Sequence, residues 1–309
     1  MTTTPDYHTD VADGPTPQRL DWLHTADGTR LRAGCWAGSR GTIWLFQGRT
    51  EYIEKYAPTI DRLTRAGWAV VTHDWRGQGL SDRPRADRNL GDIQHFSQYQ
   101  QDVAALLAHA PFTALPKPWV LFAHSMGGAI GLETLTGVHP FKAAIFSAPM
   151  WDLPRPKLVG PLAEAGLILA TKLGFGGRYF FGGGPTNAAL SQPFAINTLT
   201  GDAENYATYL RHLKARPELA LGGPSMRWVR AALLQAAHLR RLPPPDLPIL
   251  TVLGGREMVV SPEAIRSQTA RQPHAHLVEI PGARHEILIE TPERQAQAWS
   301  EIDAFLEKL

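Results

Sequence analysis

The chain has 309 residues, of which 43% are hydrophobic and 19% charged, and its formal net charge is +2. This composition is typical of a folded globular protein and excludes a disordered chain, while the net charge is too small to predict nucleic-acid binding. The single cysteine, Cys35, excludes an intrachain disulfide and a cysteine metal cluster. We expect neither a metal nor another cofactor.

The first elements in chain order alternate between strands and helices. Two short segments, residues 20–24 and 30–36, flank an Asp27-Gly28 turn and predict a β-hairpin. Buried strands are then predicted at 42–46, 68–72, 119–122 and 143–146, with helices at 51–65 and 94–109. This order predicts an α/β fold with a mostly parallel central sheet and helices on both faces.

The alternation stops after Pro149. Residues 150–243 contain no clear buried strand, and their patterns predict helices at 161–173, 205–214 and 225–239. The α/β order then resumes, with strands at 249–253 and 276–280 and helices at 262–269 and 292–306. We therefore predict a core formed by residues 18–149 and 244–309, interrupted by a helical cap at residues 150–243. Residues 1–17 are polar and predict a mobile tail.

A serine follows one of the predicted buried strands. Ser125 stands in Ala123-His124-Ser125-Met126-Gly127 and is followed by a helix rich in small residues. A serine in a sharp turn from strand to helix is exposed above the sheet, and the turn requires small residues where strand and helix nearly touch. The pattern favours a nucleophilic serine over an ordinary turn or helix cap.

Two further loops supply the groups that such a serine requires. His285 follows the last predicted strand and Glu257 the preceding strand, so the chain order is serine, acid, histidine. All three residues follow the carboxyl ends of strands, where open parallel sheets place their sites. We predict that His285 is the general base and that Glu257 orients it. Asp246 and Asp152 are the alternative acids.

An oxyanion site needs two convergent N–H groups. We expect one from Met126, which follows the serine. The other is expected from the loop Gln47-Gly48-Arg49-Thr50, where Arg49 N–H is our choice and Gln47 N–H the alternative.

Four parts of the sequence form an ordered set: Phe46-Gln47-Gly48-Arg49-Thr50-Glu51, His73-Asp74-Trp75-Arg76-Gly77-Gln78-Gly79-Leu80-Ser81, the serine turn, and the acid and histidine loops. Through this set the chain resembles the serine α/β-hydrolases, in the branch of the monoacylglycerol lipases and bacterial lysophospholipases. The resemblance implies an α/β-hydrolase fold, a catalytic triad of Ser125, Glu257 and His285, and a helical lid. Ala123, Gln47 and Glu257 stand where that family usually has glycine, histidine and aspartate.

The predicted cap differs in charge from the rest of the chain. Residues 150–243 contain eleven Lys or Arg and five Asp or Glu residues, a formal charge of +6. This favours contact with an anionic membrane surface or with phosphate headgroups, while a solvated arginine-rich surface is the alternative. The apolar residues that would make such a contact are Leu158, Leu162, Leu167, Ile168, Leu169, Leu173 and Phe175. Phe180 and Phe181 would either join this contact or belong to the ordinary core.

We predict a serine hydrolase that cleaves carboxylic esters of acyl-chain lipids, either monoacylglycerol or lysophospholipid. The alternatives within this fold are a short-chain carboxylesterase and an amidase or peptidase. A catalytically silent ligand-binding protein and a membrane-surface interaction module are the non-enzyme alternatives. Residues 1–6 lack the basic start and apolar core of a signal peptide, so we expect a cytoplasmic location. The predicted cap would then make peripheral contact with the inner membrane surface.

Overall fold

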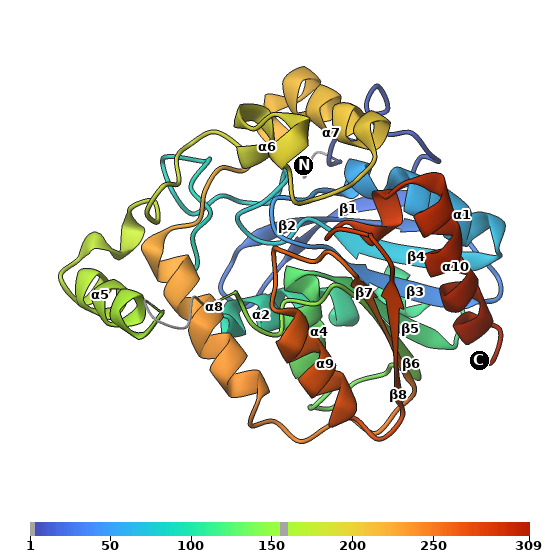
Figure 1. Cartoon of the computed structure of the whole chain (residues 1–309). Coiled ribbons are helices and arrows are strands. Elements are labelled where there is room, and N and C mark those ends of the chain that lie inside the picture. Colours follow the sequence, from blue (N-terminus) through green and yellow to red (C-terminus); the bar gives the residue numbers. More distant parts are fainter. Residues whose placement is uncertain (1–3, 155–159) are drawn as a thin grey trace.

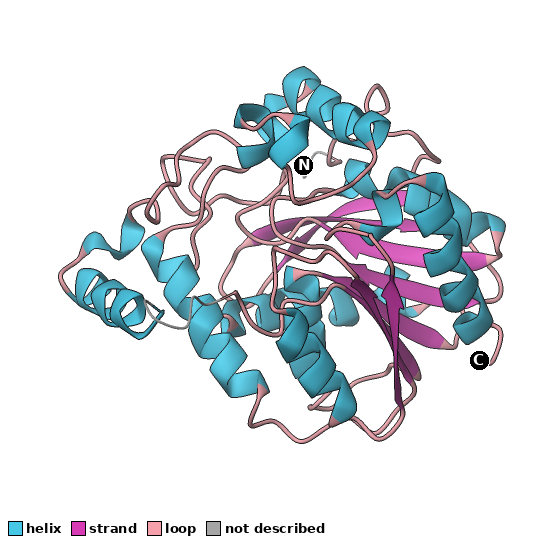
Figure 2. Ribbon diagram, viewed as in Figure 1, coloured by secondary structure: helices cyan, strands magenta, loops and turns pink. Residues whose placement is uncertain are grey.

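A computed structural model describes residues 4–154 and 160–309, and its centre is an eight-stranded sheet in the order β1-β2-β4-β3-β5-β6-β7-β8. The β1–β2 and β2–β4 pairs are antiparallel and all other pairs are parallel. Figures 1 and 2 show the twisted sheet crossing the molecule between layers of helices. The strands are β1 (Arg19–His24), β2 (Arg30–Trp36), β3 (Gly41–Phe46), β4 (Trp68–His73), β5 (Trp119–His124), β6 (Ala143–Ser147), β7 (Ile249–Gly254) and β8 (Ala275–Ile280).

Helices cover both faces of the sheet, which confirms the predicted fold class. On one face α1 and α10 share an apolar core with the sheet, and on the other face α2, α4, α8 and α9 do so. The helices are α1 (Ala57–Arg65), α2 (Ser97–Ala108), α3 (Ala110–Thr113), α4 (Met126–Thr134), α5 (Gly160–Lys172), α6 (Ala188–Ser191), α7 (Ala203–Ala215), α8 (Met226–Leu239), α9 (Pro262–Ala270) and α10 (Pro292–Leu306). Short 3-10 turns lie at Ile53–Tyr56, Phe175–Gly177, Phe194–Ile196, Pro217–Leu219 and Ile287–Ile289.

The strand order places a functional site next to β3. From β3 the chain moves to β4 on one side and then returns to β5 on the other side. Loops at the carboxyl ends of strands diverge where the order reverses, and this leaves a crevice that can bind a ligand. The loop containing Arg49 follows β3 and Ser125 follows β5, so both predicted site segments border this crevice.

The inserted segment, residues 150–243, contains α5, α6, α7 and α8 between β6 and β7, and its described residues form no sheet strand. In Figure 1, α6 and α7 lie above the sheet and α5 projects at the side. Tyr206, Tyr209 and Leu213 of α7 pack against Tyr52 beside β3. The insertion therefore contacts the loop that follows β3. Its division from the core as a separate cap stays a prediction.

The N-terminal segment has defined contacts over its described residues, 4–17. Val11 is only 4% exposed and joins the apolar cluster around α7, and Pro15 accepts hydrogen bonds from Tyr7 and Trp36. The polar composition of this segment gave no indication of these few anchoring side chains. Mobility of this segment stays a prediction.

The loop after β4 is held by Asp74. One carboxylate oxygen accepts the Ile53 amide at 2.9 Å and the other the Leu80 amide at 2.8 Å, while buried Arg32 pairs with the same carboxylate at 2.7 Å. Gly79 has a φ of +48° and lies so close that a Cβ would clash with Asp74. The sequence pattern around Asp74 thus builds a framework beside the β3 loop.

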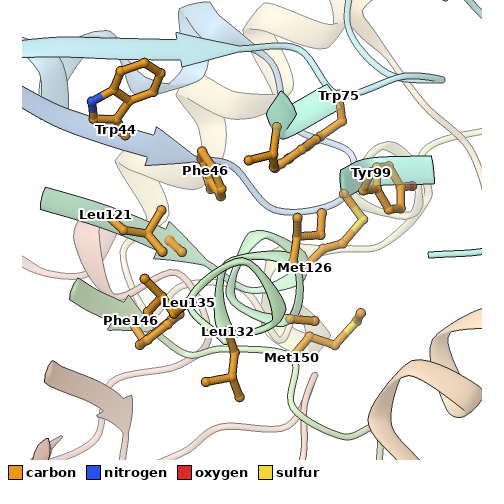
Figure 3. Packing of buried hydrophobic residues seen from close by; sticks show 14 of the residues in the cluster. Trp44, Phe46, Trp75, Tyr99, Leu121, Met126, Leu132, Leu135, Phe146 and Met150 are labelled. Carbon is orange, nitrogen blue, oxygen red and sulfur yellow. The ribbon is translucent and has the colours of Figure 1, made fainter. Parts of the chain in front are cut away.

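Helix α4 packs close to the end of β3. Figure 3 shows Phe46, Leu121 and Phe146, from β3, β5 and β6, gathered around this helix. A Cβ on Gly127, in the first turn of α4, would lie 2.3 Å from the Phe46 carbonyl oxygen and 2.6 Å from that of Gln47. Only glycine permits this approach.

We expect Gly127→Ala to destabilise the fold by about 3 kcal/mol, because strand and helix must separate to admit the methyl group. Thermal denaturation measures the change as a lower Tm. Gly137→Ala is the matched control, since Gly137 is exposed and its added Cβ would meet only the Thr134 carbonyl oxygen, at 3.8 Å. Equal melting temperatures for the two variants would contradict this prediction.

Candidate active site

Ser125 occupies a strained turn between β5 and α4. Its φ of +49° lies in a region that non-glycine residues rarely adopt. The turn is held by the backbone: Ser125 N–H donates to the Ser147 carbonyl at 3.1 Å, and the Ser125 carbonyl accepts from Gly128 and Met150 at 2.9 and 2.8 Å. The hydroxyl is therefore presented at the carboxyl end of the sheet, beside the N-terminus of α4.

The structure brings Ser125, His285 and Glu257 together. His285 Nε2 lies 2.9 Å from Ser125 Oγ, and Nδ1 lies 2.8 Å from Glu257 Oε2. The other glutamate oxygen, Oε1, accepts the amides of Val259 and Val260 at 2.6 and 3.1 Å. All three side chains of the trio are buried. Hydrogen bonds on both sides of the imidazole are the arrangement that general-base activation of a serine requires.

The two alternative acids lie in other ion pairs. Asp246 pairs with His274 at 3.1 Å, and Asp152 pairs with Arg240 at 2.7 Å. Glu257 is the carboxylate that contacts His285. The additional methylene of glutamate is accommodated because the carboxylate is fixed by the backbone of its own loop.

Burial and charge act in opposite directions on this pair. Burial alone would lower the pKa of His285, but the Glu257 carboxylate and its hydrogen bond outweigh burial and raise that pKa above its ordinary value. Burial would raise the pKa of Glu257, but His285 and the two backbone donors lower it overall. The carboxylate therefore stays ionised at neutral pH, and it stabilises the imidazolium that would form during proton transfer.

The amides of Met126 and Arg49 are available as oxyanion donors. Neither donates a hydrogen bond to another of the described residues. The neighbouring Gly48 amide, by contrast, donates to the Glu51 carboxylate. Gln47 is buried in the same loop, and its side chain donates to Thr72. The glutamine thus supports β4 from the position of the family's usual histidine.

A buried ion-pair network next to His285 was not expected from the sequence. Lys55 pairs with Glu51 and, at 2.7 Å, with Glu286, and Glu286 lies 3.5 Å from His124 Nε2. Burial would raise the pKa of Glu286, but Lys55 and the histidines lower it to about 2. Two features of the sequence could have indicated this network. Glu51 and Lys55 are four residues apart, and the carboxylate of Glu286 is adjacent to His285 in the chain.

The same network contains the described residues best placed to hold a metal ion. Glu51, His124 and Glu286 offer ligand atoms within 4.8 Å of one another. The Lys55 ammonium already pairs with both carboxylates. Burial would lower the pKa of Lys55, but Glu286 and Glu51 raise it above its ordinary value, so the ammonium stays charged. Lys55 therefore already supplies the positive charge that a metal ion would otherwise bring to these two carboxylates.

A cavity of about 700 Å³ opens above Ser125 and His285. Its volume suits a small or medium-sized organic ligand. The inserted segment supplies much of its wall, including Phe180, Phe181, Leu199, Tyr206, Tyr209 and Trp228. Among the helices of the described chain, none combines the length and apolarity needed to cross a bilayer.

A lysophospholipase and a probable lysophospholipase are similar in sequence to this chain. The chain is 34% identical over 259 residues to lysophospholipase L2 of Escherichia coli (strain K12), covering 79% of this chain and 73% of the relative. It is 29% identical over 270 residues to probable lysophospholipase L2 of Haemophilus influenzae, covering 86% and 84%.

A solved structure shares the fold. A soluble variant of monoglyceride lipase from Saccharomyces cerevisiae, in complex with a substrate analog, matches with a TM-score of 0.71 and 21% identity, over 96% of this chain and 98% of the other. The family model described as serine aminopeptidase, S33, matches residues 37–292. The chain therefore belongs to the serine aminopeptidase (S33) family of α/β-hydrolases, and lysophospholipase L2 is among its relatives.

Proposed function

We propose that this protein is a serine hydrolase that cleaves the carboxylic ester of an acyl-chain lipid, either a lysophospholipid or a monoacylglycerol. The observation that carries the proposal is the buried imidazole of His285, hydrogen-bonded to Ser125 on one side and to Glu257 on the other. The names of the lysophospholipase relatives support an acyl-lipid ester as the substrate.

The proposed reaction has two halves. His285 Nε2 takes the proton of Ser125 as Oγ attacks the ester carbonyl, and the oxyanion accepts hydrogen bonds from the Met126 and Arg49 amides. The imidazolium then gives this proton to the leaving alcohol, and an acyl-enzyme remains. Water, deprotonated by His285, attacks the acyl group, and the imidazolium then returns this proton to Ser125 Oγ as the bond to the acyl group breaks and the fatty acid leaves. Ser125 and His285 thus regain their starting protonation states at the end of each cycle.

Peptide hydrolysis is the second candidate, because the family description names aminopeptidases. An aminopeptidase must bind the substrate's terminal ammonium, and an unpaired carboxylate is the usual partner for such a cation. The carboxylates that line this cavity, Glu51 and Glu286, pair with Lys55. This pairing favours the ester substrate.

We also propose that the inserted segment makes peripheral contact with an anionic membrane surface. This segment combines a formal charge of +6 with apolar side chains that are 40–71% exposed. These side chains are Ile168, Leu169, Leu173, Phe175, Phe181 and Ile196. Leu167, which the sequence placed in this surface, is instead buried, with an exposure of 2%. Leu158 and the side chain of Leu162 lie outside the described residues.

One assay series tests the proposed substrate and the membrane contact. Purified protein is given p-nitrophenyl esters of increasing chain length, the matching anilides, and lysophospholipid and monoacylglycerol of one acyl length. We expect long-chain esters to be preferred and anilides to react far more slowly. We further expect faster hydrolysis in vesicles containing anionic lipid, with the gain lost at high salt. Preference for anilides, or for acetyl esters, would refute the acyl-lipid ester as substrate.

A further inference from the structure

Arg49 carries a positive charge without a carboxylate partner. Its guanidinium Nη2 donates to the Gly222 carbonyl at 3.0 Å and lies over the Trp228 ring, with 5.1 Å from Cζ to the ring centroid. Within residues 4–154 and 160–309, no carboxylate forms an ion pair with this guanidinium, and Nε has no hydrogen-bond acceptor. Buried Arg32, by contrast, is paired with Glu54 and with a second carboxylate.

The charge persists although its surroundings disfavour it. Burial lowers the pKa of Arg49 to about 10, so the guanidinium remains protonated at neutral pH. Arg49 is half-buried, and a half-buried charge without a carboxylate partner costs free energy that a bound anion would recover. The single carbonyl of Gly222 satisfies one donor and leaves the others available.

The position of Arg49 connects this charge to the ester-cleaving site. The preceding residue, Gly48, is so close to the nucleophile that a Cβ there would lie 3.1 Å from Ser125 Cβ. Arg49 lines the same cavity as Ser125 and His285, and it is the one lysine or arginine among the described residues of the cavity wall. An anionic group on the substrate would therefore meet this guanidinium while the ester lies at the serine.

We propose that the Arg49 side chain binds the phosphodiester of a lysophospholipid and thereby sets a preference for this substrate over uncharged monoacylglycerol. The inference rests on the proposed lipid-ester activity and deepens it by assigning the substrate class. In a lysophospholipid, only the glycerol unit separates the acyl ester from the phosphate, so both groups fit within one cavity. A guanidinium presents forked N–H donors that match phosphate oxygens, and hydrogen bonds to charged groups are the stronger ones.

The test compares Arg49→Met and Arg49→Lys with the parent on lysophosphatidylcholine, lysophosphatidylglycerol and monoacylglycerol of one acyl length, all below the micellar range. The readout is kcat/KM for each lysophospholipid divided by kcat/KM for monoacylglycerol. We expect this ratio to fall about 10- to 100-fold in Arg49→Met and less in Arg49→Lys, because lysine keeps the charge but loses the fork.

Arg83→Met is the matched control. Arg83 is also an arginine that donates to carbonyls of the inserted segment, those of Glu218 and Ala220, but it does not line the cavity. Arg83→Met should leave the ratio of kcat/KM values unchanged. If Arg49 only anchored the β3 loop to Gly222, Arg49→Met would lower kcat/KM equally for lysophospholipids and monoacylglycerol, and its ratio would be unchanged too. That result would overturn the proposal.

A binding measurement on the parent protein keeps the proposal testable if a variant fails to fold. Uncleavable ether analogues, an alkyl-lysophosphatidylcholine and the matching alkylglycerol, are compared as competitive inhibitors. We expect the phosphate-bearing ether to bind at least about tenfold more tightly. Equal inhibition constants would refute the role of Arg49 while ester hydrolysis continues, whereas absence of any lipid-ester hydrolysis would refute the proposed function itself.

Discussion

Replacement of Ser125 by alanine is expected to reduce kcat by on the order of a million-fold, because the acyl-enzyme cannot form without Oγ. The variant should also lose covalent labelling by a fluorophosphonate probe, which reacts with an activated serine. Initial rates on a p-nitrophenyl ester measure the first effect, and intact-mass spectrometry of the labelled protein measures the second. The fold should persist, since the strain at the φ of +49° belongs to the backbone and an alanine occupies the same turn.

Ser300→Ala is the matched control for this experiment. Ser300 is exposed on α10, a helix that covers a face of the sheet. This variant should keep both hydrolysis and labelling. If Ser125→Ala still bound the probe covalently, another residue would be the nucleophile and the proposed mechanism would be wrong.

Glu257→Gln is expected to lower kcat by on the order of 10⁴-fold, because it traps the imidazole in the wrong tautomer. The Val259 and Val260 amides both donate to Glu257 Oε1, so the glutamine must turn its carbonyl oxygen toward them. Its NH₂ group then faces His285 Nδ1, which must accept. The proton consequently moves to Nε2, the atom that should accept the proton of Ser125.

The pH profile gives a second readout of the same carboxylate. The ester-cleaving form requires neutral His285, so kcat/KM falls as the pH is lowered through the His285 pKa. Glu257 raises that pKa above the ordinary value of about 6.5, while burial opposes the rise. Removing the negative charge leaves burial dominant, and the acid limb of the residual activity should move to lower pH. An acid limb at the same pH in parent and variant would contradict the pairing.

Asp246→Asn serves as the control for the acid. Asp246 is strongly exposed and pairs with His274 on the surface. Its substitution should leave both rate and pH profile unchanged. If this variant, instead of Glu257→Gln, lost activity, the acid would have been wrongly assigned.

Much of the fold could be predicted from local sequence patterns. The apolar runs at 249–253 and 119–122 became β7 and β5, and the helical pattern at 292–306 became α10. The pattern at 51–65 is divided, since a 3-10 turn at Ile53–Tyr56 precedes α1, which has Pro58 in its first turn. Proline lacks an N–H and so suits the start of a helix better than its interior. Periodicity alone does not locate such a boundary.

The succession of strands and helices along the chain, the serine turn and the two loops with Glu257 and His285 were determined by the sequence itself, because each depends on a few neighbouring residues. The distances among the three side chains depend on how separate strands align in the sheet, and only the tertiary structure decided them. The tertiary structure also decided which carboxylate contacts His285, and it left Arg49 without a carboxylate partner among the described residues. Pairing between charges distant in the chain follows from packing of whole elements, and no local pattern contains that information.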